Sequence, residues 1–128
     1  MDHLLLRRVE THLPEARVVI DHFHVIQDAN RRLNEARKIE QDAWKIEIPR
    51  KLFQMGKEKL RPAQRTKIEA FSRKYPSLKE FYWMKEALCS FCKLKDKKAA
   101  SKSLKDLIQI ALLSDEVAMM QWGRTLQR

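Results

Sequence analysis

Glycine is scarce in this chain, whose 128 residues include only Gly56 and Gly123. Loops that cradle a phosphate need several glycines, because the backbone must approach the ligand closely. The chain therefore holds no P-loop and no dinucleotide-binding fingerprint. β-Sandwiches and barrels also depend on glycine in their many tight turns. The scarcity favours helices joined by polar turns.

One short segment departs from the helical pattern. Residues Ala16 to Asp21 read A-R-V-V-I-D, in which three β-branched side chains precede a carboxylate. This pattern predicts a short buried strand over Arg17–Ile20. A single strand cannot form a sheet, so it either pairs with a second copy of the chain or belongs to a larger domain. We expect a mainly α fold, a helical bundle with one short N-terminal β-strand.

Apolar residues recur every three or four positions along the rest of the chain, as in amphipathic helices. The longest run predicts one helix of roughly 25 residues, ended by Pro49. Its apolar positions are Phe23, Ile26, Ala29, Leu33, Ala36, Ile39, Ala43 and Ile46. The other predicted segments are, in chain order, a short helix over Leu4–His12, a basic helix or turn over Arg50–Lys59, a helix from Pro62 to Tyr75, a helix from Ser77 to Cys92, a helix holding Leu104 to Leu112, and a last helix through Val117, Met120 and Leu126.

Local signals mark the ends of these helices. Ser77 and Glu80 form a capping-box pattern, with Leu78, Phe81, Leu88 and Cys92 on one side of the helix that follows. A lysine-rich break at Lys93–Lys98 precedes the next helix. Ser114 then supplies a cap for the last helix.

The positive charge is concentrated in the middle of the chain. The net charge is +10, and residues 50–105 alone carry +12, whereas the segments on either side carry −1 each. A basic face of this kind attracts polyanions, and DNA or RNA is favoured over a membrane because the segment lacks a strongly apolar face. The alternative is a solvated, lysine-rich surface that keeps the protein soluble.

Two cysteines and two histidines could together form a metal site. Cys89 and Cys92 form a C-x-x-C, and His22 with His24 is the nearest comparable cluster. A zinc-dependent nuclease built on these four residues is one hypothesis, but two small apolar residues on a packed helix are the better interpretation of the cysteines. Two cysteines suit a reducing cytosol, and no apolar run is long enough to span a membrane, so we expect a soluble, cytoplasmic protein.

The three tryptophans, Trp44, Trp83 and Trp122, are separate helix residues. We interpret them as core or interface anchors, not as a platform for stacking bases.

The segment Pro14–Ile26 reads P-E-A-R-V-V-I-D-H-F-H-V-I and is followed by Asn30, Leu33 and Arg37. It resembles the DDE transposases of bacterial insertion sequences of the ISL3 type, with their P-x-A, D-x-F-H-V and N-x-x-L elements. The resemblance continues through Leu60–Gln64, Tyr75-Pro76-x-Leu78, Met84–Leu88 and Arg124–Leu126, and so covers essentially the whole chain.

The resemblance implies part of a ribonuclease-H-like α/β domain with its helical insertion. In the complete enzyme, two aspartates and a later glutamate hold two divalent metals, Mg²⁺ or Mn²⁺, for DNA strand cleavage and transfer. Asp21 and His24 match a D-x-x-H element that lies near the scissile phosphate, which is the assignment we favour. The alternative is that Asp21 is itself the second metal-binding aspartate. We expect the first aspartate and the glutamate to be missing, so the chain alone is expected to be an inactive fragment that binds no metal tightly.

Two domains are predicted, a partial ribonuclease-H-like catalytic core over residues 1–48 and a basic helical insertion over residues 49–128. DNA and further copies of the chain are the expected partners, without a membrane or a small-molecule substrate. The predicted phosphate contacts are Arg50, Lys51, Lys57, Lys59, Arg61, Arg65, Lys67, Arg73 and Lys74. The alternative function is a non-catalytic oligomerisation module that pairs through the strand and the apolar helices without binding DNA.

Overall fold

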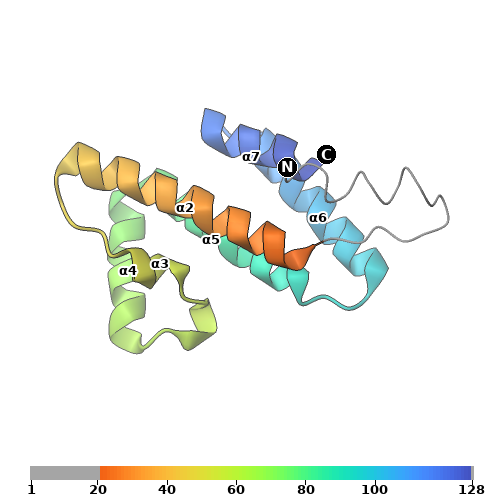
Figure 1. The fold of residues 1–128 in the computed structure, drawn as a ribbon, viewed down its shortest axis with the longest axis horizontal. Helices are drawn as coiled ribbons and strands as arrows, with labels where there is room; N and C mark the ends of the chain where they lie inside the picture. Colours follow the sequence, from red (N-terminus) through yellow and green to blue (C-terminus); the bar gives the residue numbers. More distant parts are fainter. Residues whose placement is uncertain (1–20, 128) are drawn as a thin grey trace. The chain divides into compact units, whose positions relative to one another are not determined.

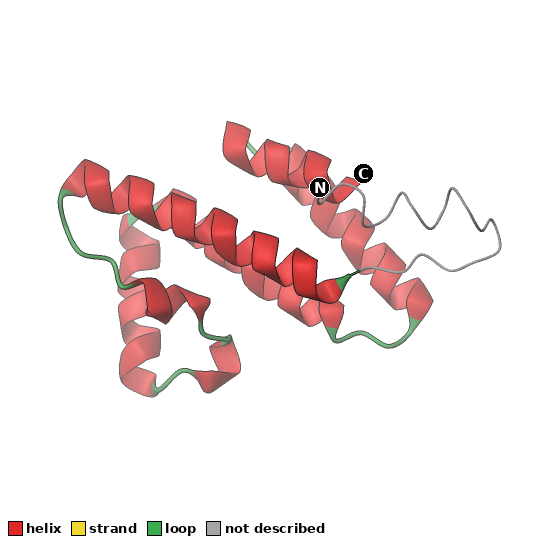
Figure 2. Ribbon diagram, viewed as in Figure 1, coloured by secondary structure: helices red, strands yellow, loops and turns green. Residues whose placement is uncertain are grey.

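The computed structural model describes residues 21–127, and every element within that range is helical (Figure 2). The mainly α prediction is therefore confirmed. The predicted strand at Arg17–Ile20 and the predicted helix at Leu4–His12 lie outside the described residues. The α-helices, labelled in Figure 1, are α2 (His22–Trp44), α3 (Arg50–Gln54), α4 (Pro62–Lys74), α5 (Pro76–Cys92), α6 (Lys97–Leu112) and α7 (Val117–Gln127). A short 3-10 helix, η1 (Lys57–Lys59), lies between α3 and α4.

The chain forms two compact units that share helices α2 and α5. Among the described residues, the first unit comprises 21–28 and 88–127, and the second unit comprises 29–87. The predicted boundary at residues 48 and 49 falls inside the second unit. The division into a catalytic part and an insertion stays a prediction.

Helix α2 confirms the predicted long helix to within two residues. It begins after Asp21, whose Oδ1 accepts a hydrogen bond from the backbone N–H of His24 at 3.3 Å, as an N-cap residue does. It ends at Trp44 because Lys45 adopts a φ of 53°. A residue in this left-handed region stops a helix, so the helix ends before Pro49 is reached.

The buried face of α2 differs in part from the predicted apolar positions. Val25, Ala29, Leu33 and Ala36 are buried, whereas Phe23 is 70% exposed. A helix turns by roughly 100° per residue, which places Phe23 more than 100° from Val25 and Ala29. Its assignment to the apolar face was wrong.

The predicted apolar positions nearer the end of α2 were also partly wrong. Ile39 is in line with the buried stripe but is 66% exposed, and Ala43 is exposed as well. The geometry of the helix alone does not explain the exposure of Ile39.

A buried arginine fixes the turn after α2. Arg37 donates from Nη1 to the backbone oxygen of Ile48 at 2.7 Å and to Gln41 Oε1 at 3.0 Å. Gln41 Oε1 in turn accepts from the backbone N–H of Ile48 at 2.9 Å, and Ile48 is completely buried. Burial and the nearby charge of Arg50 lower the pKa of Arg37 below its ordinary value, although Asp42 opposes the shift. The two side chains therefore pair both polar groups of a buried peptide segment.

Aromatic side chains join the three shorter helices of the second unit. The ring of Phe53 on α3 lies 6.0 Å from that of Phe71 on α4 and 5.7 Å from that of Tyr82 on α5. Such pairs stabilise a core beyond their buried area. The other buried apolar side chains here include Leu52, Leu60, Ile68, Leu78, Phe81 and Met84.

Prolines begin both α4 and α5. Pro62 opens α4 as predicted, and Gln64 Oε1 accepts from the backbone N–H of Arg61 at 2.8 Å. The capping box predicted at Ser77 was wrong, because α5 already begins at Pro76, with the N–H of Lys79 bonded to the Tyr75 oxygen. Proline fits a first helical position since its missing N–H has no partner there.

Helices α6 and α7 pack against each other in the first unit. Asp96 caps α6 by accepting from the N–H of Ala99 at 3.2 Å, and Ser114 Oγ accepts from the N–H of Glu116 at 3.0 Å before α7. The buried side chains between the helices are Leu104, Leu107, Ala111, Met119, Trp122 and Leu126. Val117, predicted on the apolar face of α7, is 63% exposed, because its position is two residues before Met119 and on the other side of the helix.

The two glycines give a matched pair of tests. A Cβ on Gly123 would lie 2.9 Å from the Cβ of Ala111 on α6, an atom fixed by the backbone, whereas a Cβ on Gly56 would meet the mobile end of the Glu58 side chain. Gly123→Ala should lower the free energy of unfolding by up to about 2 kcal/mol, since overpacking costs about 1–3 kcal/mol and the gain in helix propensity offsets about 1 kcal/mol of it. Gly56→Ala should be neutral or stabilising by about 0.4–1 kcal/mol.

Thermal unfolding followed by circular dichroism measures both changes. A gain in stability for Gly123→Ala, of the kind expected for Gly56→Ala, would show that α6 and α7 are not in close contact at this point.

Candidate functional site

All nine predicted phosphate contacts are exposed and belong to the second unit. They lie on α3, on η1, on α4 and at Arg61 just before α4: Arg50, Lys51, Lys57, Lys59, Arg61, Arg65, Lys67, Arg73 and Lys74. The structure thus brings the predicted basic residues into one compact unit, while their role as DNA contacts stays a prediction.

The cations of α4 form two separate stripes. At roughly 100° per residue, Arg65 and Arg73 fall within about 80° of each other, and Arg61 joins them just before the helix. Lys67 and Lys74 lie on another side, roughly 100° or more from that stripe. The stripe of Arg65 and Arg73 borders a cavity, described next.

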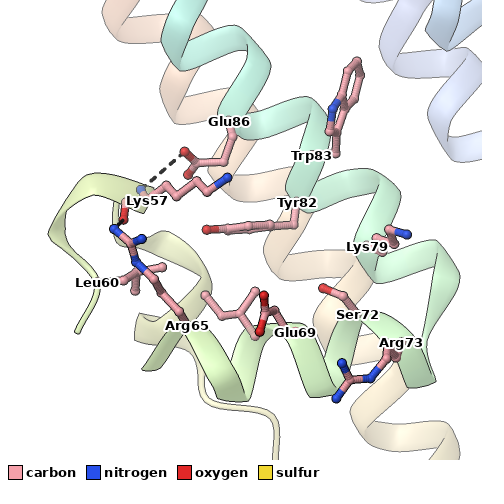
Figure 3. A pocket seen from close by; sticks show the side chains of 11 residues that line it. Lys57, Leu60, Arg65, Glu69, Ser72, Arg73, Lys79, Tyr82, Trp83 and Glu86 are labelled. Carbon is pink, nitrogen blue, oxygen red and sulfur yellow. Dashed lines mark hydrogen bonds between the residues drawn. The ribbon is translucent and has the colours of Figure 1, made fainter. Parts of the chain in front are cut away.

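An open cavity of about 610 Å³ lies between η1, α4 and α5 in the second unit (Figure 3). Four cationic residues line it, namely Lys57, Arg65, Arg73 and Lys79. Its apolar and aromatic lining comes from Leu60, Ile68, Tyr82 and Trp83. In Figure 3, the ring of Tyr82 lies across the cavity, and Trp83 stands at its edge on the same helix as Lys79.

Two carboxylates also line the cavity, Glu69 from α4 and Glu86 from α5. Figure 3 shows the Glu69 carboxylate directed toward Tyr82, beside the Ser72 hydroxyl. The cavity therefore combines an apolar lining with a few polar groups and a cationic border, which is the usual composition of a ligand site.

Hydrogen bonds hold the η1 side of the cavity in place. The backbone N–H of Lys57 donates to Glu86 Oε1 at 3.3 Å, and Arg65 Nη2 donates to the backbone oxygen of Lys57 at 3.2 Å. The first of these bonds is drawn dashed in Figure 3. The chain around η1 is thereby tied to both α4 and α5.

A buried lysine supports the same region. Lys85 is 1% exposed, and its Nζ donates to Glu86 Oε2 at 2.5 Å and to the Met55 backbone oxygen at 3.1 Å. It also lies 4.8 Å from the centre of the Tyr82 ring. Although it falls in the basic segment, Lys85 is a structural residue that faces no solvent.

Lys79, Glu69 and Tyr82 were not predicted as site residues. A signal for them was available in the helical spacing. Arg65, Glu69 and Arg73 are four residues apart on α4, which places them on one face. Lys79 and Trp83 have the same spacing on α5. Which faces meet depends on the packing of the two helices, which the sequence does not reveal.

Asp21 and His24 form an exposed pair at the start of α2, in the first unit. His24 Nδ1 donates to Asp21 Oδ2, and the side chains are 52% and 43% exposed for His24 and Asp21. Partial desolvation acts to raise the pKa of Asp21, but hydrogen bonds from His24 and from the Phe23 backbone outweigh it, so the pKa is lowered. The pairing orients the imidazole and leaves its Nε2 for another partner.

A family model for ISL3-type DDE transposases, described as a transposase, matches residues 1–128. The chain belongs to this transposase family. No curated protein and no solved structure matches the chain. The resemblance inferred from the D-x-F-H-V block is thus confirmed, and the function is transposase-related.

DDE transposases use divalent metals in their complete enzymes. Within residues 21–127, no group of three or more histidine, cysteine, aspartate or glutamate side chains is placed to hold a metal ion. Asp21 is paired with His24, and this pair does not amount to the carboxylate set that two divalent metals require. We therefore derive no catalytic step from this transposase chain, and the metal-binding and catalytic roles of Asp21 and His24 stay predictions.

The cysteines lie in the last turn of α5. Neither cysteine forms a disulfide and both are half-buried, and the His22 ring contacts Phe91 at 5.9 Å between centroids. The four zinc ligands of the nuclease hypothesis are not gathered within the described range. Burial raises the pKa of Cys92 to about 11, with a smaller contribution from Cys89.

The tryptophans of this transposase chain differ in exposure. Trp122 is completely buried between α6 and α7, which confirms its role as a core residue. Trp44 is 62% exposed and contacts Tyr75 at 6.1 Å, and Trp83 is 49% exposed. A core role for these two was wrong, and an interface role for them stays a prediction. No helix in the described part of the chain is sufficiently long and apolar to cross a membrane.

The raised pKa of Cys92 predicts that its thiol is alkylated slowly at neutral pH. Burial favours the neutral form, so about one thiol in a thousand is ionised at pH 8, and alkylation by iodoacetamide should still accelerate between pH 9 and 10. A Cys89→Ser variant isolates the reaction of Cys92, and mass spectrometry measures its rate. The urea-unfolded variant is the control, and its rate should rise less than twofold between pH 9 and 10, because an ordinary thiol with a pKa of about 9 is already half ionised at pH 9. A native rate that rises as little over this interval would contradict the burial of the thiol.

Proposed function

We propose that this transposase chain binds the phosphate backbone of DNA through the exposed cations of its second unit. The proposal rests on one observation: all nine predicted basic residues are exposed and belong to the second unit, which also contains the cavity. Membership of a transposase family supports DNA as the polyanion. In transposition, the chain would supply helices that hold DNA while the complete enzyme cleaves and transfers strands.

Charge and exposure set the character of this binding. Exposed lysine and arginine side chains neutralise phosphates and release condensed counterions, so the affinity falls steeply with salt and depends little on sequence. The stripe of Arg61, Arg65 and Arg73 and the neighbouring Lys57 lie on the cavity side of the unit, and we assign them the largest share. Lys85 takes no part, because it is buried and bonded to Glu86.

The proposal also includes the exposed pair at the start of α2. Asp21 orients the His24 imidazole through Nδ1, and Nε2 is then available to contact a DNA phosphate. This arrangement supports a positioning role near the scissile phosphate in the complete enzyme, in preference to metal binding by Asp21.

Neutralising Lys57, Lys59 and Arg65 to glutamine should weaken binding to unrelated duplexes by the same factor. Each lost phosphate contact should also reduce the slope of log affinity against log salt by about 1. Fluorescence anisotropy of a labelled duplex across a salt series measures both quantities.

The matched control changes three exposed lysines of the first unit, Lys95, Lys98 and Lys105, to glutamine. It removes the same charge and should keep most of the salt slope. Equal losses in the two triple variants would make the binding a general effect of net charge, and no binding at low salt would make the basic residues a solvated surface.

A second candidate function is oligomerisation, favoured by an apolar patch in the first unit. Ile110, Leu113 and Val117 are 51%, 73% and 63% exposed and lie around the turn between α6 and α7. Clustered exposed apolar side chains are typical of protein contacts.

If the patch joins copies of the chain, Leu113→Lys with Val117→Lys should reduce the mass of the particle in solution to that of a monomer. Sedimentation equilibrium measures the mass, and circular dichroism verifies the fold. A wild-type protein that is already monomeric at high concentration would rule out this function for the patch.

A further inference from the structure

We infer that the cavity between η1, α4 and α5 receives an unpaired DNA base, stacked on Trp83, while the phosphates on either side of that base contact the surrounding cations. The inference rests on the proposed binding of DNA and adds a specific ligand to the cavity. It assigns to Trp83 the stacking role that the sequence did not predict.

The size and lining of the cavity suit a planar, largely apolar group. Its volume of about 610 Å³ falls within the range of about 300–1,000 Å³ that is usual for small-molecule sites. Leu60 and Ile68 contribute buried apolar side chains to its wall. A base with its sugar is a ligand of this class, and an unpaired base reaches such a cavity more readily than a paired one, whose unstacking and unpairing cost free energy.

The distribution of charge separates the base from its phosphates. Glu69 and Glu86 line the cavity itself, and Figure 3 shows the Glu69 carboxylate directed toward the Tyr82 ring. The Glu69 carboxylate disfavours an anion inside the cavity but can accept hydrogen bonds from the amino and imino groups of a base. Both oxygens of Glu86 are already bonded, to the Lys57 N–H and to Lys85 Nζ. Arg65, Arg73 and Lys79 supply the positive charge for phosphates at its border. A neutral planar group with anions on both sides, as in a nucleotide chain, matches this pattern better than a free phosphate.

An exposed indole beside these cations completes the site. Trp83 is 49% exposed even though it belongs to the well-packed helix α5, and Lys79 lies one turn away. Stacking on an exposed aromatic ring is the usual way in which proteins hold single-stranded nucleotides, and it requires no particular base. Removal of the ring from such a site weakens binding by about fivefold to a hundredfold.

The test compares three labelled DNA duplexes by anisotropy, using the full chain. One is fully paired, the second carries a single unpaired base in the middle, and the third carries an abasic sugar at the same place. We expect the unpaired base to raise the affinity by about tenfold and the abasic site to return it to the value of the paired duplex.

Two tryptophan variants assign the gain to the cavity. Trp83→Leu should abolish the gain from the unpaired base and keep the affinity for the paired duplex. The matched control Trp44→Leu removes another exposed indole, one that does not line the cavity, and it should keep the gain. Circular dichroism verifies that both variants remain folded.

The outcomes separate the two proposals. Equal affinity for the three duplexes, or a gain that survives Trp83→Leu, overturns the inference while the salt-dependent binding of duplex DNA stands. No binding to any duplex overturns the proposed function and the inference together. Saturable binding of an acidic, tyrosine-containing peptide that is lost in Trp83→Leu, without any gain from the unpaired base, would assign the cavity to a protein segment and overturn the inference.

Discussion

The second unit depends on the burial of one charged side chain, Lys85. An ammonium group taken out of water is costly unless it is paired and hydrogen-bonded. Here Nζ is paired with Glu86 and bonded to the Met55 oxygen, and Glu86 also accepts from the Lys57 backbone. One lysine therefore fixes the carboxylate that holds η1 against α5, and the cavity exists because η1 is held there.

The basic residues of the second unit are of two kinds, buried and exposed. Lys85 has its charge compensated inside the protein, whereas Lys57, Arg65 and Arg73 keep theirs in contact with solvent. Net charge attracts a polyanion from a distance, but only the exposed lysine and arginine side chains can contact its phosphates. The density of positive charge in the sequence thus overstates the number of side chains that can reach a phosphate.

The helices were largely predictable because their signals are local. Proline at Pro62 and the apolar period of α2 act within a turn or two, and each element formed near its predicted position. The cap at Asp96 was not predicted, and Ser114, predicted as a cap of α7, bonds instead to the N–H of Glu116 just before that helix. The errors concern the exposure of side chains and the pairing of helices, which depend on contacts between residues far apart in the sequence. Phe23 and Val117 fit an apolar pattern by spacing but face solvent, and the pairing of α4 with α5 that creates the cavity has no counterpart in the order of the residues. Asp21 and His24 were predicted from a motif, and their contact follows from their spacing at a helix start.

Helices α2 and α5 each belong to both units, so the chain passes between the units inside regular helices and not through a loop. Helical hydrogen bonds form cooperatively, and a residue at such a crossing is ordered from both directions. Melting of one unit would expose a free helix end in the other and weaken its last turns. The two units are thereby thermodynamically linked through their own backbones, so a substitution in one can lower the stability of the other without any side chain reaching across.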